Sequence, residues 1–346
     1  MMPTPIWAST VIQNESLLMV REGERIQAPL LCHPKEITAV QNAALTIQYE
    51  PGRDWILEDD MLVIPKGSRI PVTEKEELEI SQYREGACFP KKGGGYLYFS
   101  EGDSFHQKQI AVTYTCEPGQ WTGYIPPRQG DRLPNPAEKL THKRDLTMII
   151  YGDSISEGYN ASGCVGVAPQ QPAWGELTAR YLEAEYHTAI CCHNPSKAGM
   201  DSKWGLEHVG ERVSVHAPDL VFLAFGMNDG TSGRTPEEFA ANTEAMMDVI
   251  RKASPHVEFV LVAPSLPNPQ ALTFEGIPFY NQQPDYKEAL DTLCREGVIV
   301  ANVRDVQREL LKKKRFIDMT GNNINHPNDF FHRVYAQVAY TSILPQ

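Results

Sequence analysis

Hydrophobic and polar residues alternate with a period of two in short segments of the first third of the chain. Such segments, or short apolar runs, lie at residues 45–49, 61–64 and 110–116, and turn residues such as Pro and Gly separate them. Alternation of this kind is typical of strands that bury one face. The pattern therefore predicts an all-β sandwich or jelly roll, and no helical pattern of comparable strength comes before about Thr141.

From about Thr141 onward, continuous apolar runs alternate with segments of helical period. One helix start is clear, because Thr235 can cap it, Pro236 suits its first position and Glu238 completes a capping box. Continuous apolar strands that alternate with amphipathic helices predict a parallel sheet covered by helices on both faces. The expected strands are 146–151, 188–192, 219–225, 259–262 and 298–300, and the expected helices are 174–186, 203–215, 236–250, 286–294, 305–314 and 329–341.

A proline-rich segment at 125–136 separates these two patterns. Because proline fixes φ, we expect a stiff, extended strap there. The chain of 346 residues is long enough for two domains. We therefore predict a β-sandwich accessory domain at 1–124, a proline-rich linker at 125–140 and an α/β domain at 141–346.

Charge narrows the range of partners. The formal net charge of −12 argues against nucleic acid as the main partner, since phosphate contacts need a concentrated basic surface. The one basic cluster, 312–315, ends an expected helix, where we expect a solvated face matched to the helix dipole. No apolar run has the ~18 residues needed to cross a bilayer, and no signal-peptide pattern is visible at the N-terminus. We expect no membrane partner.

The seven cysteines are an odd number, and Cys191 and Cys192 are adjacent within an expected strand. This usage suits reduced thiols in a cytoplasm better than a disulfide framework. Neither Cys-x-x-Cys nor His-x-x-x-His spacing offers a zinc site. We therefore expect a cytoplasmic protein without a metal or another cofactor.

The segment 151–158, Tyr-Gly-Asp-Ser-Ile-Ser-Glu-Gly, directly follows the apolar run 146–150. Catalytic groups of open α/β sheets lie at the carboxyl ends of strands, which makes Ser154 a candidate nucleophile. A serine hydroxyl needs a nearby base to take its proton. Most serines after strands only cap the following helix, so Gly-Asp-Ser taken alone favours a cap at Ser154, and Asp153 can be only a turn former.

His326 is the candidate base. Pro327 follows it and keeps His326 out of the αR region just before the last expected helix. A histidine at such a loop position can lean over the top of the sheet. Because the chain has ten histidines, a structural role for this one, such as a bond to a backbone carbonyl, stays open.

Asn228 and Gly199 are the candidates for stabilising negative charge. Attack on an ester carbonyl creates an oxyanion, and each donor aimed at it is worth ~10²–10³ in rate. The motif Gly-Met-Asn-Asp that contains Asn228 follows strand 219–225, and Gly199 follows strand 188–192, where its missing Cβ allows a ligand to approach the backbone N–H. Each can be a turn residue when taken singly, but they share one sheet edge with Ser154.

The ordered motifs Gly-Asp-Ser, Gly, Gly-x-Asn-Asp and His-Pro at these positions resemble the SGNH, or GDSL-type, hydrolase family, from about Asp145 to the C-terminus. The resemblance implies a flavodoxin-like parallel sheet with helices on both faces. It also implies that Ser154 is the nucleophile of an ester hydrolase and His326 its general base. The Ser154 N–H, the Gly199 N–H and the Asn228 side chain would then form the oxyanion hole.

One position departs from the family pattern. The family usually places an aspartate three residues before the histidine, to orient the imidazole, and this chain has Asn323 there. An amide oxygen can still accept from the ring N–H and set its tautomer, although it cannot supply full countercharge. We therefore expect a Ser–His dyad with Asn323 as a neutral orienter, and we rank Asp318 and Asp329 below it as acids.

A β-sandwich before an SGNH domain resembles the arrangement of several bacterial carbohydrate esterases. The resemblance implies a serine esterase that removes short acyl groups, above all acetyl, from an oligosaccharide or another small acyl ester. Aromatic residues of the long connection 264–280, with Trp174 and Trp204, can stack on a sugar ring or pack the loop onto its own domain. The alternatives are a lipolytic or thioester hydrolase, or a catalytically weakened carbohydrate-binding protein. A homo-oligomer stays open.

Overall fold

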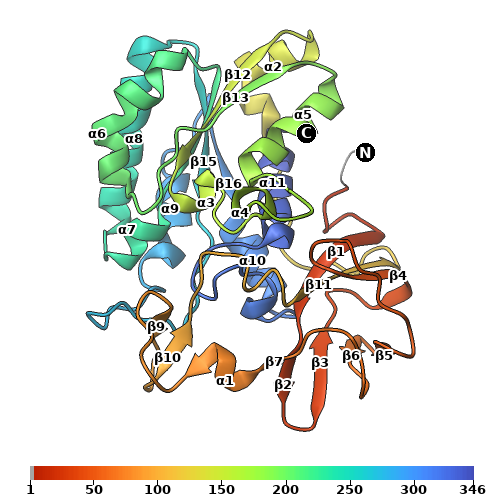
Figure 1. The fold of residues 1–346 in the computed structure, drawn as a ribbon. Helices are drawn as coiled ribbons and strands as arrows, with labels where there is room; N and C mark the ends of the chain where they lie inside the picture. Colours follow the sequence, from red (N-terminus) through yellow and green to blue (C-terminus); the bar gives the residue numbers. More distant parts are fainter. Residues whose placement is uncertain (1–3) are drawn as a thin grey trace.

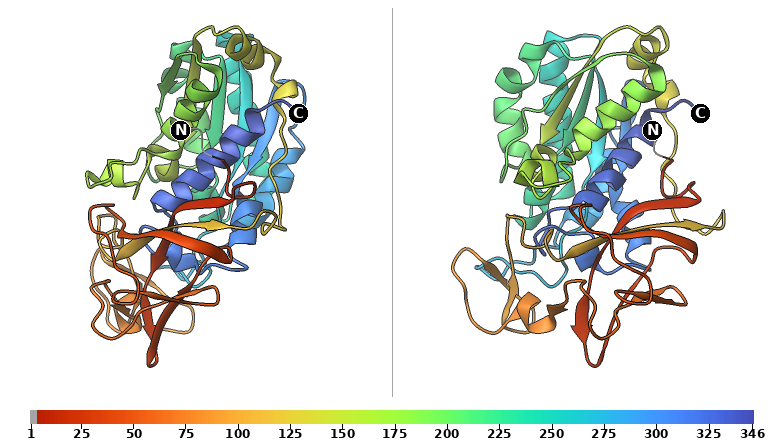
Figure 2. Two further views of the ribbon diagram at one scale, coloured as in Figure 1. Left: turned by 90° about the vertical axis from the view of Figure 1, so that its right-hand side faces the viewer. Right: turned by 45° about the vertical axis from the view of Figure 1, so that its right-hand side comes forward.

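The computed structural model describes residues 4–346. Figure 1 shows a β-rich part, formed by the N-terminal third of the chain, below an α/β part formed by the rest. Both views in Figure 2 show the C-terminal helix α11 (Asp329–Ile343, blue) beside the N-terminal strands (red), and α11 contacts strand β1 (Val11–Leu18). The first strand and the last helix thus meet where the two parts join.

The N-terminal part consists of strands and one short helical turn, α1 (Lys75–Leu78). One antiparallel sheet has the order β1-β11-β4, with β4 at Pro34–Asn42 and β11 at Gln109–Cys116. A second has the order β5-β6-β3-β2-β7, from β2 (Val20–Glu22), β3 (Arg25–Pro29), β5 (Ile56–Glu58), β6 (Met61–Val63) and β7 (Thr73–Glu74). A third has the order β8-β10-β9, from β8 (Glu79–Ile80), β9 (Cys88–Pro90) and β10 (Tyr96–Tyr98). The predicted all-β class of this part is confirmed.

The alternation in β11 has the predicted consequence, because Ile110, Val112 and Tyr114 are all fully buried. The expected strand at 45–49 is wrong. Gln48 makes only an isolated bridge to Gln41 there, in a turn region that follows β4.

The α/β part is built on one parallel sheet with the order β13-β12-β14-β15-β16. In chain order this is 2-1-3-4-5, the flavodoxin-like arrangement, so the predicted fold class is confirmed. The strands are β12 (Leu146–Gly152), β13 (Ile190–His193), β14 (Leu220–Ala224), β15 (Glu258–Ala263) and β16 (Val298–Asn302). In such a sheet, ligands bind at the carboxyl ends of the strands beside the point where strand order reverses, which here lies between β12 and β14.

Helices cover both faces of this sheet. One face packs against α6, α8 and α9, and the other against α5, α10 and α11. Figure 1 shows α3 and α7, which follow β12 and β14, at the end of the sheet nearest the β-rich part. The helices of this part are α3 (Ser154–Glu157), α4 (Ser162–Val165), α5 (Trp174–Tyr186), α6 (Ser202–Arg212), α7 (Met227–Thr231), α8 (Pro236–Ala253), α9 (Tyr286–Asp291), α10 (Val303–Leu310) and α11. The capping box predicted from Thr235 and Glu238 is present at the start of α8.

The proline-rich connection is not extended along its whole length. It contains a 3₁₀ turn at Gly130–Arg132 and a helix, α2 (Pro134–Thr141). Pro134 is the first residue of α2 and Pro136 also lies in its first turn, where a missing N–H costs no helical hydrogen bond. The expectation of an extended strap at 125–136 is therefore wrong for 130–136.

The two parts of the chain share one hydrophobic cluster, which joins residues such as Leu17 and Tyr114 to Phe330 and Val334 of α11. A buried ion pair crosses the same boundary, because Lys314 faces Glu15 and neither side chain is exposed. The expectation of a solvated basic cluster at 312–315 is therefore wrong for Lys314. The domain boundaries 1–124, 125–140 and 141–346 stay a prediction.

Within residues 4–346, no helix combines the length and the apolar character that a bilayer span requires. The same residues hold no group of three or more His, Cys, Asp or Glu side chains arranged to bind a metal ion.

Candidate active site

Ser154 lies at the tip of the turn that leads from β12 into α3. Asp153 caps this helix, since its side chain accepts a hydrogen bond from the Ile155 N–H at 3.0 Å. Gly152 is required because a Cβ there would lie 2.4 Å from the carbonyl oxygen of Ala224. Burial raises the pKa of the Asp153 carboxyl to about 7, against the opposing effect of the Ile155 N–H. The turn therefore holds the Ser154 hydroxyl at the carboxyl end of the sheet.

His326 is held by its own backbone over this end of the sheet. Its N–H donates to Asn322 Oδ1 at 3.0 Å, and its carbonyl accepts from the Gly321 N–H at 2.9 Å. The ring points at the serine, with 2.8 Å between His326 Nε2 and Ser154 Oγ. Both residues are only 5% exposed. The imidazole is thus within reach of the serine proton.

The other ring nitrogen, His326 Nδ1, faces two oxygen atoms. Glu101 Oε2 lies 2.8 Å from it and Asn160 Oδ1 lies 3.1 Å from it. The orientation of the Asn160 amide follows from its nitrogen, which donates to the carbonyls of Gly102 at 3.2 Å and Gly321 at 3.1 Å. Because a carboxylate and an amide oxygen only accept, the ring proton belongs on Nδ1, and Nε2 is free to accept from the serine.

Asn323 does not orient the imidazole. Its side-chain nitrogen donates to the carbonyl of Tyr98 at 3.1 Å, and its own carbonyl accepts from Asn268 Nδ2 at 2.8 Å. The two lower-ranked acids also lie elsewhere. Asp318 accepts from Arg315 and from the Leu18 N–H, and Asp329 accepts from the Ser162 N–H. The role predicted for Asn323, orienting the imidazole, is therefore wrong, and Glu101 and Asn160 lie at Nδ1 instead.

Sequence reasoning missed Glu101 for a physical reason. This residue lies 225 positions before His326, in the loop between β10 and β11 of the N-terminal part. A glutamate in a Ser-Glu-Gly-Asp turn has the composition of an ordinary surface loop. The local sequence around Asn160 is equally typical of a surface loop. Its one local signal is a positive φ of 62°, which is seen only in the structure.

The two other predicted site residues follow the neighbouring strands. Gly199 has a φ of +78°, which favours glycine, and among residues 4–346 its N–H meets no acceptor. Asn228 lies in the first turn of α7, and its side-chain nitrogen donates one hydrogen bond to the Met200 carbonyl at 2.9 Å. The second hydrogen of that amide remains available to another acceptor. Asn228 is thus tied to the residue after Gly199.

Further hydrogen bonds join these loops to the end of β12. Ser196 Oγ accepts from the Gly152 N–H at 3.0 Å, and the Lys197 N–H donates to the Gly152 carbonyl at 3.0 Å. Asp229, the buried residue after Asn228, accepts from the Ser202 N–H at the start of α6 at 2.9 Å and lies beside Arg234. The loops that carry Ser154, Gly199 and Asn228 are therefore mutually braced, as a preorganised set of donors requires. Their joint action on an oxyanion stays a prediction.

That prediction can be tested at Asn228. Replacing Asn228 by alanine is expected to lower kcat for a simple ester by about 10²-fold and to leave KM nearly unchanged, because a charge-stabilising donor acts in the transition state. The measurement is steady-state hydrolysis of p-nitrophenyl acetate. Thr231→Ala is the control, since Thr231 lies on the same helix and bonds to the carbonyls of Met227 and Phe279. Equal losses in the two variants would show that only the integrity of α7 matters.

The structure distinguishes between the two alternatives left open for the aromatic residues. Trp174 is fully buried in the core, and Trp204 stacks on His208 of its own helix with 4.4 Å between ring centroids. Neither is placed to stack on a sugar. Phe274, in the long connection after β15, is 56% exposed, and its ring lies 5.9 Å from that of Tyr83 in the N-terminal part, which is 53% exposed. This pair forms an open aromatic surface where the two parts meet.

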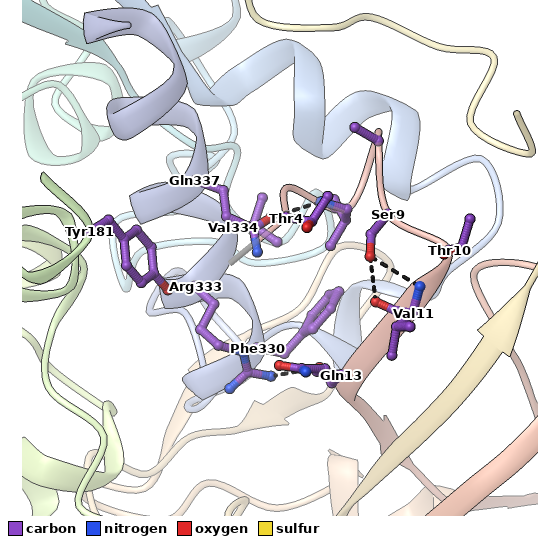
Figure 3. Close-up of a pocket in the computed structure, with 12 residues that line it drawn as sticks. Thr4, Ser9, Thr10, Val11, Gln13, Tyr181, Phe330, Arg333, Val334 and Gln337 are labelled. Carbon is purple, nitrogen blue, oxygen red and sulfur yellow. Dashed lines mark hydrogen bonds between the residues drawn. The ribbon is translucent and has the colours of Figure 1, made fainter. Parts of the chain in front are cut away.

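A separate pocket of about 390 Å³ lies between the N-terminal segment, α5 and α11 (Figure 3). Arg333 lines it, but its guanidinium donates to the Asn14 carbonyl at 2.6 Å and to the Gln171 side chain at 2.6 Å. Both of its terminal nitrogens therefore already donate to acceptors within the protein. Ser154, His326 and Asn228 do not line this pocket, so it is distinct from the site described above.

Comparison with known proteins defines the class. Residues 150–334 match the sequence model of the GDSL-like Lipase/Acylhydrolase family, which is more than half of the chain. The chain therefore belongs to this family of acyl hydrolases. The match covers the turn of Ser154 as well as Gly199, Asn228 and His326, but not Glu101.

Particular relatives were found in sequence and in structure. An arylesterase of Vibrio mimicus is 28% identical over 110 residues, or 32% of this chain and 51% of the relative. Thioesterase 1/protease 1/lysophospholipase L1 of Escherichia coli K12 is 27% identical over 108 residues, or 31% and 47%. The chain thus spans about half the length of these curated relatives.

Among solved structures, a two-domain esterase (CEX) active on acetylated mannans has a TM-score of 0.48 at 17% identity, over 61% of this chain and 53% of that one. Axe2, an acetylxylan esterase from Geobacillus stearothermophilus, has a TM-score of 0.46 at 16% identity, over 58% and 95%.

Proposed function

We propose that this protein is a serine esterase that removes short acyl groups, most importantly acetyl, from a carbohydrate. The observation that carries the proposal is the 2.8 Å contact between Ser154 Oγ and His326 Nε2 at the carboxyl edge of the sheet. A hydroxyl paired with an oriented imidazole is the arrangement that acyl transfer requires. The family match supports the same class of reaction.

The proposed reaction has two halves. In the first, Ser154 Oγ attacks the ester carbonyl as His326 Nε2 takes the serine proton, and the C–O bond to the alcohol breaks while His326 returns the proton to the departing alkoxide. In the second, His326 takes a proton from water as the water oxygen attacks the acyl carbon. The bond from this carbon to Ser154 Oγ then breaks, His326 returns the proton to Oγ, and the carboxylic acid leaves. The N–H groups of Ser154 and Gly199 and the Asn228 amide stabilise the oxyanion in both halves.

The carbohydrate part of the proposal is supported by the aromatic surface of Tyr83 and Phe274. Phe274 also lies 5.7 Å from Phe89, which contacts Phe279, and the Phe279 carbonyl accepts a hydrogen bond from Thr231 of α7. A chain of contacts therefore links this aromatic pair to the helix that carries Asn228. Exposed aromatic rings beside a polar site can pack on the apolar face of a sugar.

The second candidate is a thioester or lipid-ester hydrolase, which the name of the Escherichia coli relative favours. A series of p-nitrophenyl esters from acetyl to decanoyl separates the two. We expect kcat/KM for acetyl to exceed that for octanoyl by about tenfold or more. A rate that rises with chain length would reject the proposal in favour of a lipolytic enzyme.

Hydrolysis of acetylated xylo-oligosaccharides then tests whether the substrate is a carbohydrate ester. Phe274→Ala and Tyr83→Ala should lower kcat/KM for the acetylated oligosaccharide and leave p-nitrophenyl acetate hydrolysis unchanged, because the small ester has no sugar to stack. Equal rates of wild type and variants on the oligosaccharide would remove the carbohydrate part and leave a simple esterase.

A further inference from the structure

We propose that Glu101, on a loop of the N-terminal part, is the positioning residue for His326, so that both parts of the chain together form one active site. The inference rests on the proposed function, because His326 is the base of that reaction. Glu101 lies outside the segment that matches the family, 150–334. The N-terminal part would then contribute directly to acyl transfer, and not only as a wall or a binding surface.

The contact with the ring has the geometry of an orienting carboxylate. Glu101 Oε2 lies 2.8 Å from His326 Nδ1, on the opposite side of the ring from Ser154. A carboxylate at this place holds the tautomer with the proton on Nδ1 and stabilises the imidazolium that forms when the serine loses its proton. Asn160 Oδ1, at 3.1 Å, can share the tautomer role but carries no charge.

The loop of Glu101 is fastened to the hydrolase part by three asparagines. Asn322 donates to Glu101 Oε1 at 3.4 Å, while its own Oδ1 accepts from the His326 N–H at 3.0 Å. Asn160 donates to the carbonyl of Gly102, the residue after Glu101. Asn323 donates to the carbonyl of Tyr98, three residues before Glu101. Asn323, which stands at the family's usual aspartate position, therefore holds the end of strand β10, from which the chain leads to Glu101.

A wider contact holds the small sheet β8-β10-β9 against the long connection after β15. The Leu272 N–H donates to the Pro90 carbonyl at 2.8 Å, and the Lys92 N–H donates to the Gln270 carbonyl at 2.9 Å. Leu97 of β10 is buried together with Ala271 and Ile324. Ile324 precedes His326 by two positions. The backbone on either side of the Glu101–His326 contact is therefore fixed, which a positioning contact needs.

A purely structural ion pair is the competing explanation. The Glu101 side chain is 37% exposed, and ion pairs at such places contribute little to folding. A structural role therefore predicts small effects on every property. A positioning role predicts a large effect on kcat and little effect on KM or stability.

The first test compares Glu101→Ala, Glu101→Gln and the control Asp103→Asn by steady-state kinetics on p-nitrophenyl acetate. Asp103 is two residues away on the same loop, and its carboxylate faces Gln107. We expect Glu101→Ala to lower kcat by about 10²-fold with KM nearly unchanged. Glu101→Gln, which keeps the shape and removes the charge, should lose less, and Asp103→Asn should match wild type. Wild-type kcat in both Glu101 variants would overturn the proposal.

Two readouts separate positioning from structure. Formate can enter the space left in Glu101→Ala, because this side chain is partly exposed, and we expect it to raise the rate of that variant but not of wild type.

The last readout does not need activity. In protein with labelled histidine, NMR can compare the Nδ1–H proton of the His326 ring in wild type and in Glu101→Gln. We expect this proton at higher field in the variant, since an amide oxygen is a weaker acceptor than the carboxylate 2.8 Å from Nδ1. The shift is expected even if the natural ester is never found, which separates this proposal from the proposed function. An unchanged Nδ1–H resonance together with unchanged kcat would show that Glu101 does not act on the ring.

Discussion

Ser154→Ala is expected to lower kcat for p-nitrophenyl acetate by ~10³ or more, the largest effect in this protein. Without Oγ no acyl-enzyme can form, and only direct attack by water on the bound ester remains. Some catalysis above the rate in water should persist, because the donors around the carbonyl stay in place. The measurement is the rate of p-nitrophenolate release at saturating substrate.

Ser156→Ala is the matched control for this variant. Ser156 stands two residues further in the same turn, is equally buried, and has its Oγ 3.5 Å from the Ala224 carbonyl. It should keep most of the activity, so a loss confined to Ser154→Ala identifies the hydroxyl and not the turn. If wild type and Ser154→Ala hydrolysed the ester at the same rate, Ser154 would not be the nucleophile.

His326→Ala should produce the second large loss, again ~10³ or more in kcat. The serine proton then has no acceptor at 2.8 Å, and the hydroxyl attacks as a weak nucleophile. Because the two side chains act as one unit, the double variant Ser154→Ala/His326→Ala should be hardly slower than either single variant. Losses that simply multiply would argue for two independent roles.

Asn323→Ala gives the comparison for His326→Ala. It removes the bond to Tyr98 but no group that faces the ring, so we expect a cost of about tenfold at most, the value of one hydrogen bond. A loss as large as that of His326→Ala would mean that holding the Tyr98 strand matters as much as the base itself. Wild-type kcat in His326→Ala would exclude this histidine as the base.

Much of the α/β part could be predicted from its pattern. The helix expected at 174–186 agrees with α5, and the capping box at Thr235 opens α8 as expected. Periodicity works here because the central strands β14 and β15 are buried on both faces and a helix such as α8 on one face, so the pattern of apolar residues within a short segment reflects its burial. The same local reasoning failed at 45–49 and at 134–141, where turn and capping geometry outweighed the pattern.

The lysine cluster shows a second kind of limit. Lys314 has the local signature of a helix end, and yet its side chain is fully buried beside Glu15, 299 positions away. Only an unlike charge delivered by another part of the fold makes such a burial tolerable. No residue close to Lys314 in the sequence indicates that Glu15 is its partner.

The amino-acid order alone therefore settles the alternation of strands and helices, and it marks Ser154 and His326 as candidates, because these properties depend on neighbours within a few positions. The partner of the histidine ring depends instead on how the N-terminal β part docks on the sheet edge. Docking is a property of two folded surfaces, and it brings Glu101 to His326 across 225 positions while Asn323, three positions away, points elsewhere. Residues close in sequence determine helix caps and turns. Contacts between distant parts of the fold determine that the Glu101 carboxylate lies beside the His326 ring.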